Sequence, residues 1–171
     1  EPMTVRLGGA GDKSGYCIIR SLQKDEINLL QDFTYEAIFI PEGEEPPAQE
    51  IVERPELRIY TDGFGTRKGD HCLVADVGGQ PVGAVWTRIM DDYGHIDDDT
   101  PSLAISLYKE YRGQGIGSKL MKKICGLLKI HGYNKVSLSV WKANYAVKMY
   151  REAGFEIVGE NEKEYIMLCS L

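Results

Sequence analysis

Apolar and polar residues follow two regular patterns along most of the chain after residue 15. Seven segments have the apolar, β-branched character or the alternation of strands, and they are 16–20, 71–77, 81–90, 102–107, 135–140, 155–159 and 165–168. Apolar residues at three- and four-residue spacing predict helices over 21–38, 48–54, 116–131 and 144–153. Residues 1–15 are rich in glycine and polar residues and follow neither period, so we expect a flexible N-terminal segment there.

The order of these segments predicts the fold class. Residues 71–107 contain three strands in succession, two of them joined by the turn residues Gly78-Gly79, which favours antiparallel neighbours. Residues 102–140 instead run strand, helix, strand, which is typical of a parallel crossover. We therefore expect a single α/β domain over residues 16–171, with about four helices flanking a mixed, mostly antiparallel sheet of six or seven strands.

Composition and charge act mainly by excluding classes of protein. The 20 basic and 26 acidic residues give a net charge of −6, which argues against a nucleic-acid partner and mildly favours an amine. No apolar run reaches the ~18 residues of a membrane span, so no membrane contact is expected. The four cysteines form no pairs and no cluster with histidine, which indicates core residues of a reducing, cytoplasmic protein without a metal site.

The segment between strand 102–107 and helix 116–131 has the clearest chemical signal, Arg112-Gly113-Gln114-Gly115-Ile116-Gly117. Its glycines allow the backbone to approach a ligand, and the amides at the helix start favour an anion. The arginine adds a planar cation suited to phosphate oxygens. The spacing matches neither the P-loop nor the dinucleotide-binding GxGxxG pattern. The loop therefore predicts a site for another phosphate-bearing ligand, with a plain strand-to-helix connector as the alternative.

A second motif further along the chain makes the loop more specific. Asn144-Tyr145-Ala146-Val147-Lys148-Met149-Tyr150 is followed by Gly154-Phe155, and together with Arg112–Gly117 it resembles the GNAT acetyltransferase superfamily. The order of elements is also similar over roughly residues 16–171. The resemblance implies a GNAT-like fold, in which the sheet splays apart at the cofactor site, between strands 102–107 and 135–140.

The resemblance also implies how acetyl-CoA is bound as co-substrate. Its pantetheine arm would lie in the gap and pair with strand 102–107 like an added strand, and its pyrophosphate would rest on the amides of the glycine loop. The residues expected to bind the cofactor are Ile105, Leu107, Lys109, Arg112, Gly113, Gln114, Gly115, Ile116, Gly117, Ser118 and Asn144.

The same resemblance suggests catalytic residues. Tyr150 corresponds to the general acid that protonates the leaving thiolate, although its helical spacing alone would also suit a packing aromatic. Many relatives place a glutamate on the strand before the loop, but residues 102–107 contain no acid. The base candidates are therefore His95 and Asp98 in the acidic loop upstream, which could equally be a solvated surface loop.

The predicted function is acetyl transfer from acetyl-CoA to a primary amine by direct attack, because no cysteine lies in a recognisable nucleophile setting. The acceptor is expected to be an amine-bearing small molecule or peptide, with Tyr35 and Glu36 lining its side of the site. Family habit favours a homodimer. Two alternatives are a non-catalytic acyl-CoA-binding or sensing module on the same fold, and a protein-interaction domain without affinity for CoA.

Overall fold

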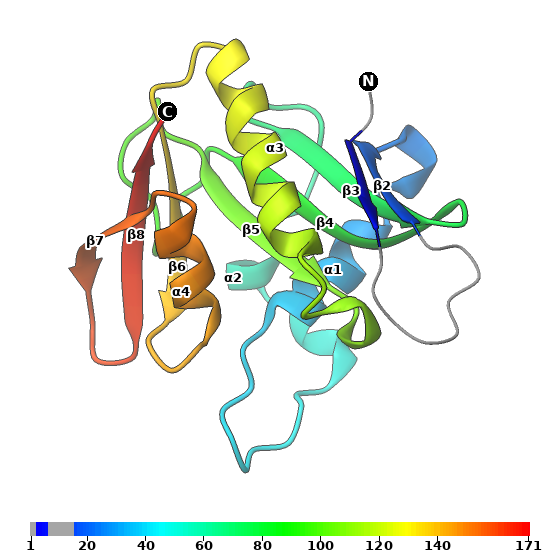
Figure 1. Cartoon of the computed structure of the whole chain (residues 1–171). Coiled ribbons are helices and arrows are strands. Elements are labelled where there is room, and N and C mark those ends of the chain that lie inside the picture. Colours follow the sequence, from blue (N-terminus) through cyan, green and yellow to red (C-terminus); the bar gives the residue numbers. More distant parts are fainter. Residues whose placement is uncertain (1–2, 7–15) are drawn as a thin grey trace.

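The computed structural model describes residues 3–6 and 16–171, and one eight-stranded sheet organises them (Figure 1). The strand order is β1-β2-β3-β4-β5-β6-β8-β7. The strands are β1 (Met3–Arg6), β2 (Tyr16–Ser21), β3 (His71–Val77), β4 (Gln80–Arg88), β5 (Ser102–Leu107), β6 (Lys135–Trp141), β7 (Glu156–Glu160) and β8 (Glu164–Ser170).

One junction in the sheet differs from all the others. Neighbouring strands pair antiparallel except β5 and β6, which are parallel and share a single register pair, Ser102 with Ser137. The Ser137 N–H donates to the Pro101 carbonyl oxygen at 3.0 Å, and beyond this point the two strands separate. The prediction of a mixed, mostly antiparallel sheet that splays between these two strands is therefore confirmed.

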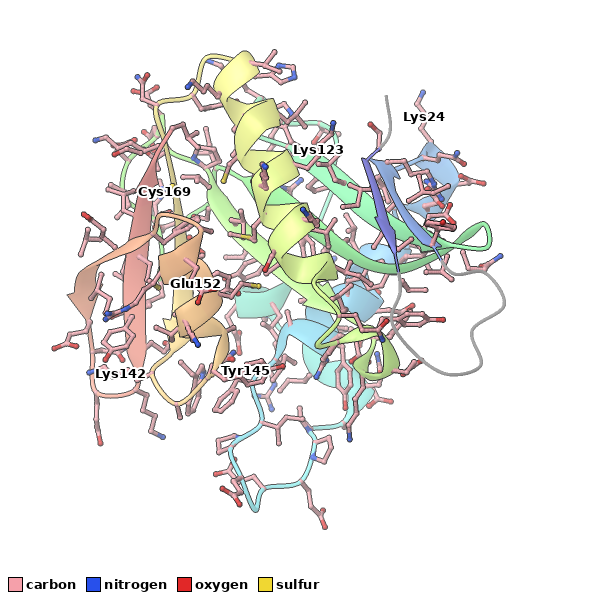
Figure 2. The ribbon with its side chains drawn as sticks, viewed as in Figure 1. Lys24, Lys123, Lys142, Tyr145, Glu152 and Cys169 are labelled. Carbon is pink, nitrogen blue, oxygen red and sulfur yellow. The ribbon has the colours of Figure 1, made fainter. Side chains whose placement is uncertain are left out.

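Helices cover both faces of the sheet. The α-helices are α1 (Leu29–Ala37), α2 (Pro55–Arg58), α3 (Ile116–Ile130) and α4 (Ala146–Glu152), and short 3₁₀ turns occur at η1 (Lys24–Glu26), η2 (Gln49–Glu53) and η3 (Lys109–Tyr111). In Figure 1, α3 lies in front of the sheet and α1 lies behind it. The outer side of α3 carries lysines such as Lys123 (Figure 2). No helix within the described residues is long and apolar enough to cross a membrane.

The two faces have separate cores because strand side chains alternate. Leu73 and Val85 pack with the buried stripe of α3, whereas their neighbours Val74 and Trp86 pack with Leu30 and Phe33 of α1. Each of these side chains is at most 5% exposed. Strands β3, β4 and β5 are therefore held from both sides, which makes β5 a rigid wall for whatever binds in the gap beside it.

The N-terminal part of the fold differs from the sequence prediction in two places. The helix expected from residue 21 begins at Leu29, because β2 continues to Ser21 and pairs with β3 there. Met3–Arg6 form β1, which pairs antiparallel with β2. The pattern of apolar residues did not predict this strand, because it is only four residues long. The rest of the segment that we expected to be flexible, residues 1–2 and 7–15, lies outside the described residues.

Gly126 gives a simple test of the α3 assignment. This glycine is exposed in the interior of the helix, and a Cβ there would meet no atom within 4 Å. We expect Gly126→Ala to raise the free energy of unfolding by about 0.5–1 kcal/mol, seen as a higher urea midpoint with an unchanged slope. Gly115→Ala is the matched control: its φ of +84° lies in the left-handed region, so alanine should destabilise there. A lower midpoint for Gly126→Ala would contradict the assignment.

Candidate functional site

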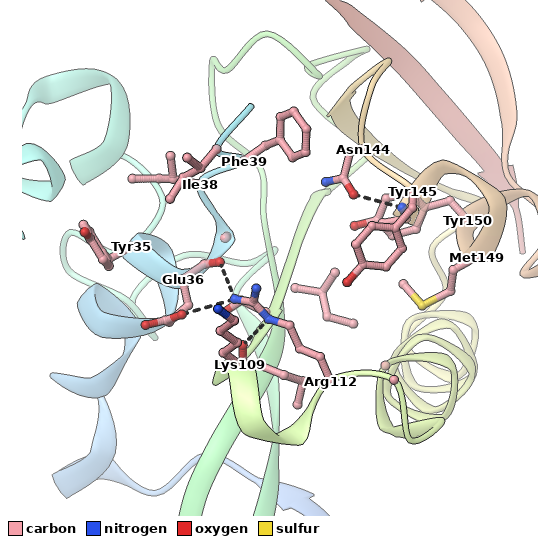
Figure 3. A pocket seen from close by; sticks show the side chains of 18 of the residues that line it. Tyr35, Glu36, Ile38, Phe39, Lys109, Arg112, Asn144, Tyr145, Met149 and Tyr150 are labelled. Carbon is pink, nitrogen blue, oxygen red and sulfur yellow. Dashed lines mark hydrogen bonds and ion pairs between the residues drawn. The ribbon is translucent and has the colours of Figure 1, made fainter. Parts of the chain in front are cut away.

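A cavity of about 740 Å³ opens where β5 and β6 separate. The end of β5 and the glycine loop form one wall, α4 forms a second, and the segment that leaves α1 forms a third. Figure 3 shows Tyr35, Glu36, Ile38 and Phe39 facing Asn144, Tyr145 and Tyr150 across this space, with Arg112 between them. The site therefore combines segments that lie far apart in the sequence.

The backbone of β5 presents free hydrogen-bonding groups to this gap. The Tyr108 N–H donates to the Val82 carbonyl oxygen of β4 at 2.9 Å, and the Pro101 carbonyl faces β6. Because backbone groups of successive strand residues point to opposite sides, the amides of Ile105 and Leu107 are directed into the gap. An extended ligand can pair with them as a further strand would.

The glycine loop, which leads into α3, lines one end of the larger cavity. Gly113 and Gly115 have φ values of +74° and +84°, a backbone conformation that side-chain-bearing residues rarely adopt. No acidic residue occupies the first turn of α3, and no side chain caps its free N–H groups. A Cβ on Gly117 would lie 3.2 Å from the Met149 sulfur, so this glycine allows α3 and α4 to approach each other. The helix start is thus an open anion site.

Arg112 has a structural role that the sequence did not indicate. Its Nε donates to the Leu107 carbonyl oxygen at 2.9 Å, and its Nη2 donates to Glu36 Oε2 at 3.2 Å and to the Glu36 carbonyl oxygen at 3.3 Å. The guanidinium therefore ties the glycine loop to the end of α1 while it still lines the cavity. A pantetheine group that donates to the Leu107 carbonyl oxygen has to share this acceptor with Arg112 Nε or displace the arginine from it.

The cavity brings together most of the residues expected to bind the cofactor. All of them line it except Gln114 and Ile116. Ile116 is fully buried in the core beneath α3, and the Gln114 side chain donates from Nε2 to the Glu110 carbonyl oxygen at 3.2 Å. These two residues belong to the loop through their backbone, and their side chains serve packing and loop shape.

Tyr150 lies deep in the site on α4. Its side chain is 8% exposed and belongs to the core, and it also lines the cavity. Burial raises the pKa of the Tyr150 phenol well above its usual value near 10, and Tyr145 adds to the effect. The phenol is therefore protonated throughout the physiological pH range, as a proton donor has to be.

Asn144 is positioned by the first turn of α4. Its Oδ1 accepts a hydrogen bond from the Ala146 N–H at 2.9 Å, which caps the helix and fixes the orientation of the amide. The same residue lines the cavity on the side of Tyr150 (Figure 3). One of its polar atoms is thus committed to the fold, and the side-chain NH₂ group remains as a donor.

A second cavity of about 240 Å³ adjoins the first through the gap between β5 and β6. Both cavities are lined by Ala37, Ile38, Phe39, Ile105, Asn144 and Tyr150. The walls that belong to the second cavity alone include Tyr60, Trp86 and Trp141, and Glu164 is the single charged side chain among the described residues that line it. Tyr150 thus stands at the junction of two spaces of different size.

A half-buried carboxylate, that of Asp92, adjoins this second cavity through Tyr60. The Tyr60 hydroxyl donates to Asp92 Oδ2 at 3.1 Å, and the Ser102 hydroxyl donates to Asp92 Oδ1 at 2.8 Å. Burial raises the pKa of Asp92, although these two hydrogen bonds oppose the effect. Sequence reasoning singled out neither Tyr60 nor Glu164, and it left Asp92 as one acid among several in a loop.

His95 and Asp98, the expected base candidates, line neither cavity. His95 Nε2 lies 3.5 Å from Asp98 Oδ1, and the Asp98 side chain is 97% exposed. The loop that carries them enters β5 at Ser102, where β5 is still paired with β6, whereas the larger cavity opens near Leu107. Their placement therefore does not support the prediction that either is the base. Among the described residues, no group of three or more His, Cys, Asp or Glu side chains is placed to hold a metal ion.

Comparison with known proteins agrees with this geometry. Residues 32–155 match the model of the acetyltransferase (GNAT) family. The thialysine N-epsilon-acetyltransferase of Sus scrofa is 32% identical over an alignment of 129 positions, and the match covers 65% of this chain and 70% of that protein. The protein of the same name from Mus musculus is 29% identical over 126 residues, with the same shares.

Solved structures with similar folds come from the same family. The GNAT domain of S. lividans PAT has a TM-score of 0.69 and 18% identity, covering 99% of this chain and 97% of that one. The PaiA N-acetyltransferase of Thermoplasma acidophilum, in complex with coenzyme A, has a TM-score of 0.67 and 18% identity, covering 91% and 99%. The chain belongs to the GNAT family and is an N-acetyltransferase.

Proposed function

We propose that this protein transfers the acetyl group of acetyl-CoA to a primary amine by direct attack. The observation that carries the proposal is the meeting of two cavities at Tyr150, in the gap between β5 and β6. The larger cavity accommodates the cofactor and the smaller one the acceptor. The two substrates thus occupy adjoining cavities and meet beside a protonated phenol.

The larger cavity fits the parts of acetyl-CoA in order. The pantetheine arm pairs with the backbone N–H groups of Ile105 and Leu107, and the pyrophosphate rests on the amides from Gly113 to Ser118. Lys109 and Arg112 add positive charge at the same end. The Thermoplasma acidophilum relative was solved in complex with coenzyme A, which supports a CoA site on this fold.

The chemistry follows from this placement. The lone pair of a neutral amine attacks the thioester carbonyl carbon, and a backbone N–H of β5, with Leu107 the candidate, stabilises the developing oxyanion. The C–S bond then breaks, and the Tyr150 hydroxyl donates its proton to the leaving sulfur. The amine nitrogen loses one proton, which returns through solvent to the tyrosinate, so the enzyme ends the cycle unchanged.

Cofactor binding is tested by ligand-induced stabilisation. Acetyl-CoA at about 100 times its Kd should add about 2.7 kcal/mol to the free energy of unfolding. Ser118→Glu should abolish this gain, because it places a carboxylate in the first turn of α3 where the pyrophosphate rests. Ser170→Glu, with the same charge change at an exposed position of β8, should keep it. No stabilisation of the wild type at millimolar acetyl-CoA would contradict the proposal.

Turnover separates an enzyme from a sensing module. Amines should cause release of free CoA from acetyl-CoA with matching formation of the N-acetyl product. A module that only binds acyl-CoA would be stabilised by the cofactor yet release no CoA with any amine. An interaction domain would show neither effect.

A further inference from the structure

Among the described residues, one charged side chain lines the smaller cavity, that of Glu164. Glu164 and Tyr60 line this cavity alone, whereas Ile105, Asn144 and Tyr150 line both cavities. A ligand that fills the smaller cavity therefore lies beside both Tyr150 and a carboxylate.

Glu164 is held in place by the start of β8, and no counter-ion for it is found in the part of the chain that the structure describes. It is half-buried, lies opposite Trp141 of β6, and its N–H donates to Asn161 Oδ1 at 2.7 Å. No ion pair found among the described residues includes Glu164.

The lysines next to Trp141 and Glu164 in the sequence, Lys142 and Lys163, contact other groups. Lys142 Nζ lies 3.0 Å from Glu160 Oε2, and Lys163 Nζ lies 5.4 Å from the centre of the Trp141 ring. Figure 2 shows Lys142 near the end of the β6–β8 pair. The charge of Glu164 is thus available to a ligand in the cavity.

Tyr60 lies close to the negative charges around the smaller cavity, and they affect its pKa. Burial raises the pKa of its phenol, and the charge of Asp92 and then that of Glu164 raise it further, while Ser139 opposes them. The Tyr60 hydroxyl is bonded to Asp92, which places Asp92 behind the tyrosine rather than in the cavity lining. Glu164 is therefore the carboxylate that a ligand meets directly.

Aromatic rings complete the environment of a cation. Phe39 and Trp141 lie with ring centroids 5.6 Å apart, and Trp86 also lines the cavity. Because the Lys163 ammonium already lies over the Trp141 ring, Phe39 and Trp86 are the rings left for a ligand cation. Aromatic faces attract ammonium groups, most strongly where water is excluded. A volume of about 240 Å³ is below the ~300–1,000 Å³ of usual ligand pockets, so it suits a small amine or one extended side chain.

The acetyl-transfer reaction and the Glu164 carboxylate favour opposite protonation states of an amine. The nitrogen that attacks the thioester has to be neutral, whereas a carboxylate stabilises an ammonium ion and raises its pKa. The nitrogen beside Tyr150 is therefore a poor partner for Glu164.

We propose that the acceptor is a small diamine or diamine-like molecule, in which Glu164 binds a second, charged nitrogen and thereby selects the substrate. This inference rests on the proposed function, because it places acetyl-CoA in the larger cavity.

The test compares amines that differ only in the second charge. Linear α,ω-diamines of three to eight carbons and the monoamines of equal length are assayed for acetyl-CoA-dependent release of CoA. For the wild type we expect at least one diamine to exceed its matched monoamine about 10- to 100-fold in kcat/KM, the size of one charge-assisted contact. Glu164→Gln should reduce that ratio to near one, chiefly by lowering kcat/KM for the diamine.

Glu162→Gln is the matched control, because Glu162 is exposed in the same β7–β8 turn and lines neither cavity. It should keep the wild-type preference. Equal wild-type rates with both amines, a ratio that survives Glu164→Gln, or no turnover of any diamine would each overturn the inference. Stabilisation by acetyl-CoA is measured on all three proteins. If acetyl-CoA does not stabilise the wild type, the proposed function itself is contradicted. If acetyl-CoA stabilises the wild type but diamines are not preferred, only the role of Glu164 is removed.

Discussion

Replacing Tyr150 by phenylalanine is expected to lower kcat for acetyl transfer by about 10²–10⁴-fold, with little change in affinity for acetyl-CoA. The substitution keeps the ring, which is 8% exposed and lies 6.1 Å from Phe155 between centroids, and it removes only the hydroxyl. A role in packing alone therefore predicts a normal rate. The measurement is kcat with a saturating amine, together with the stabilisation by acetyl-CoA as a check on folding and binding.

Tyr145→Phe provides the control for this experiment. Tyr145 lies one turn before Tyr150 and also lines the larger cavity, but its side chain is 80% exposed and the smaller cavity does not include it. Its loss of a hydroxyl should leave kcat near the wild-type value. A Tyr150→Phe rate within a few-fold of the wild type would contradict the role of Tyr150 as the acid.

The raised pKa of Tyr150 also predicts the alkaline side of the pH profile. Since the folded phenol ionises above pH 10, its proton should remain available, and kcat should not fall through loss of this group below that pH. Above pH 10 the unfolded chain loses this proton before the folded protein does. Stability should therefore decrease as the pH rises there.

Asp70→Asn is expected to lower the free energy of unfolding by about 3–5 kcal/mol, because it breaks a fully buried ion pair. Arg88 of β4 donates from Nε and Nη2 to the two oxygens of Asp70, both at 2.9 Å, and both side chains are 0% exposed. Arg88 also donates to the Ile59 carbonyl oxygen, and the Gly65 N–H donates to Asp70. The pair thus fastens the segment before β3 to the sheet, and the variant leaves the guanidinium buried without its counter-charge.

The same pair predicts an acid limb of stability. Burial alone would raise the pKa of Asp70, but the bonds from Arg88 and from the N–H groups of Arg67 and Gly65 outweigh it and lower the pKa below 3.8. The unfolded chain therefore binds the proton at a higher pH than the folded protein does. This contribution is present above about pH 4, and it is lost as the pH falls through the folded pKa.

Asp62→Asn is the comparison for both effects. Asp62 pairs with Arg58 at 3.2 Å, but the two side chains are 65% and 52% exposed, so the change should cost at most about 1 kcal/mol. The urea unfolding midpoints of both variants and of the wild type are measured from pH 3 to pH 7. A midpoint for Asp70→Asn as high as that of Asp62→Asn would contradict the importance of the buried pair.

The larger cavity, to which we assign acetyl-CoA, was largely predictable from the sequence. Alternation of apolar residues placed β5 at residues 102–107, and helical spacing placed α3 within one residue of its observed end. The glycine loop and Tyr150 were found because their signal is local, within one loop and one helical turn. The helix 21–38 was placed too early, because the pairing of Ser21 with Leu73 of β3 overrides the local helical pattern.

The smaller cavity, to which we assign the amine, depends on contacts that no local pattern contains. Glu164 reaches the smaller cavity because β8 returns to pair with β6 and lies opposite Trp141 there, and Asp92 is relevant only because Tyr60 of a distant segment donates to it. Periodicity and turn residues thus determined the elements and the cofactor loop, since each depends on neighbours a few residues apart. The gap between β5 and β6, the junction of the two cavities at Tyr150 and the placement of Glu164 were decided by the tertiary structure, because they depend on the order in which the strands assemble.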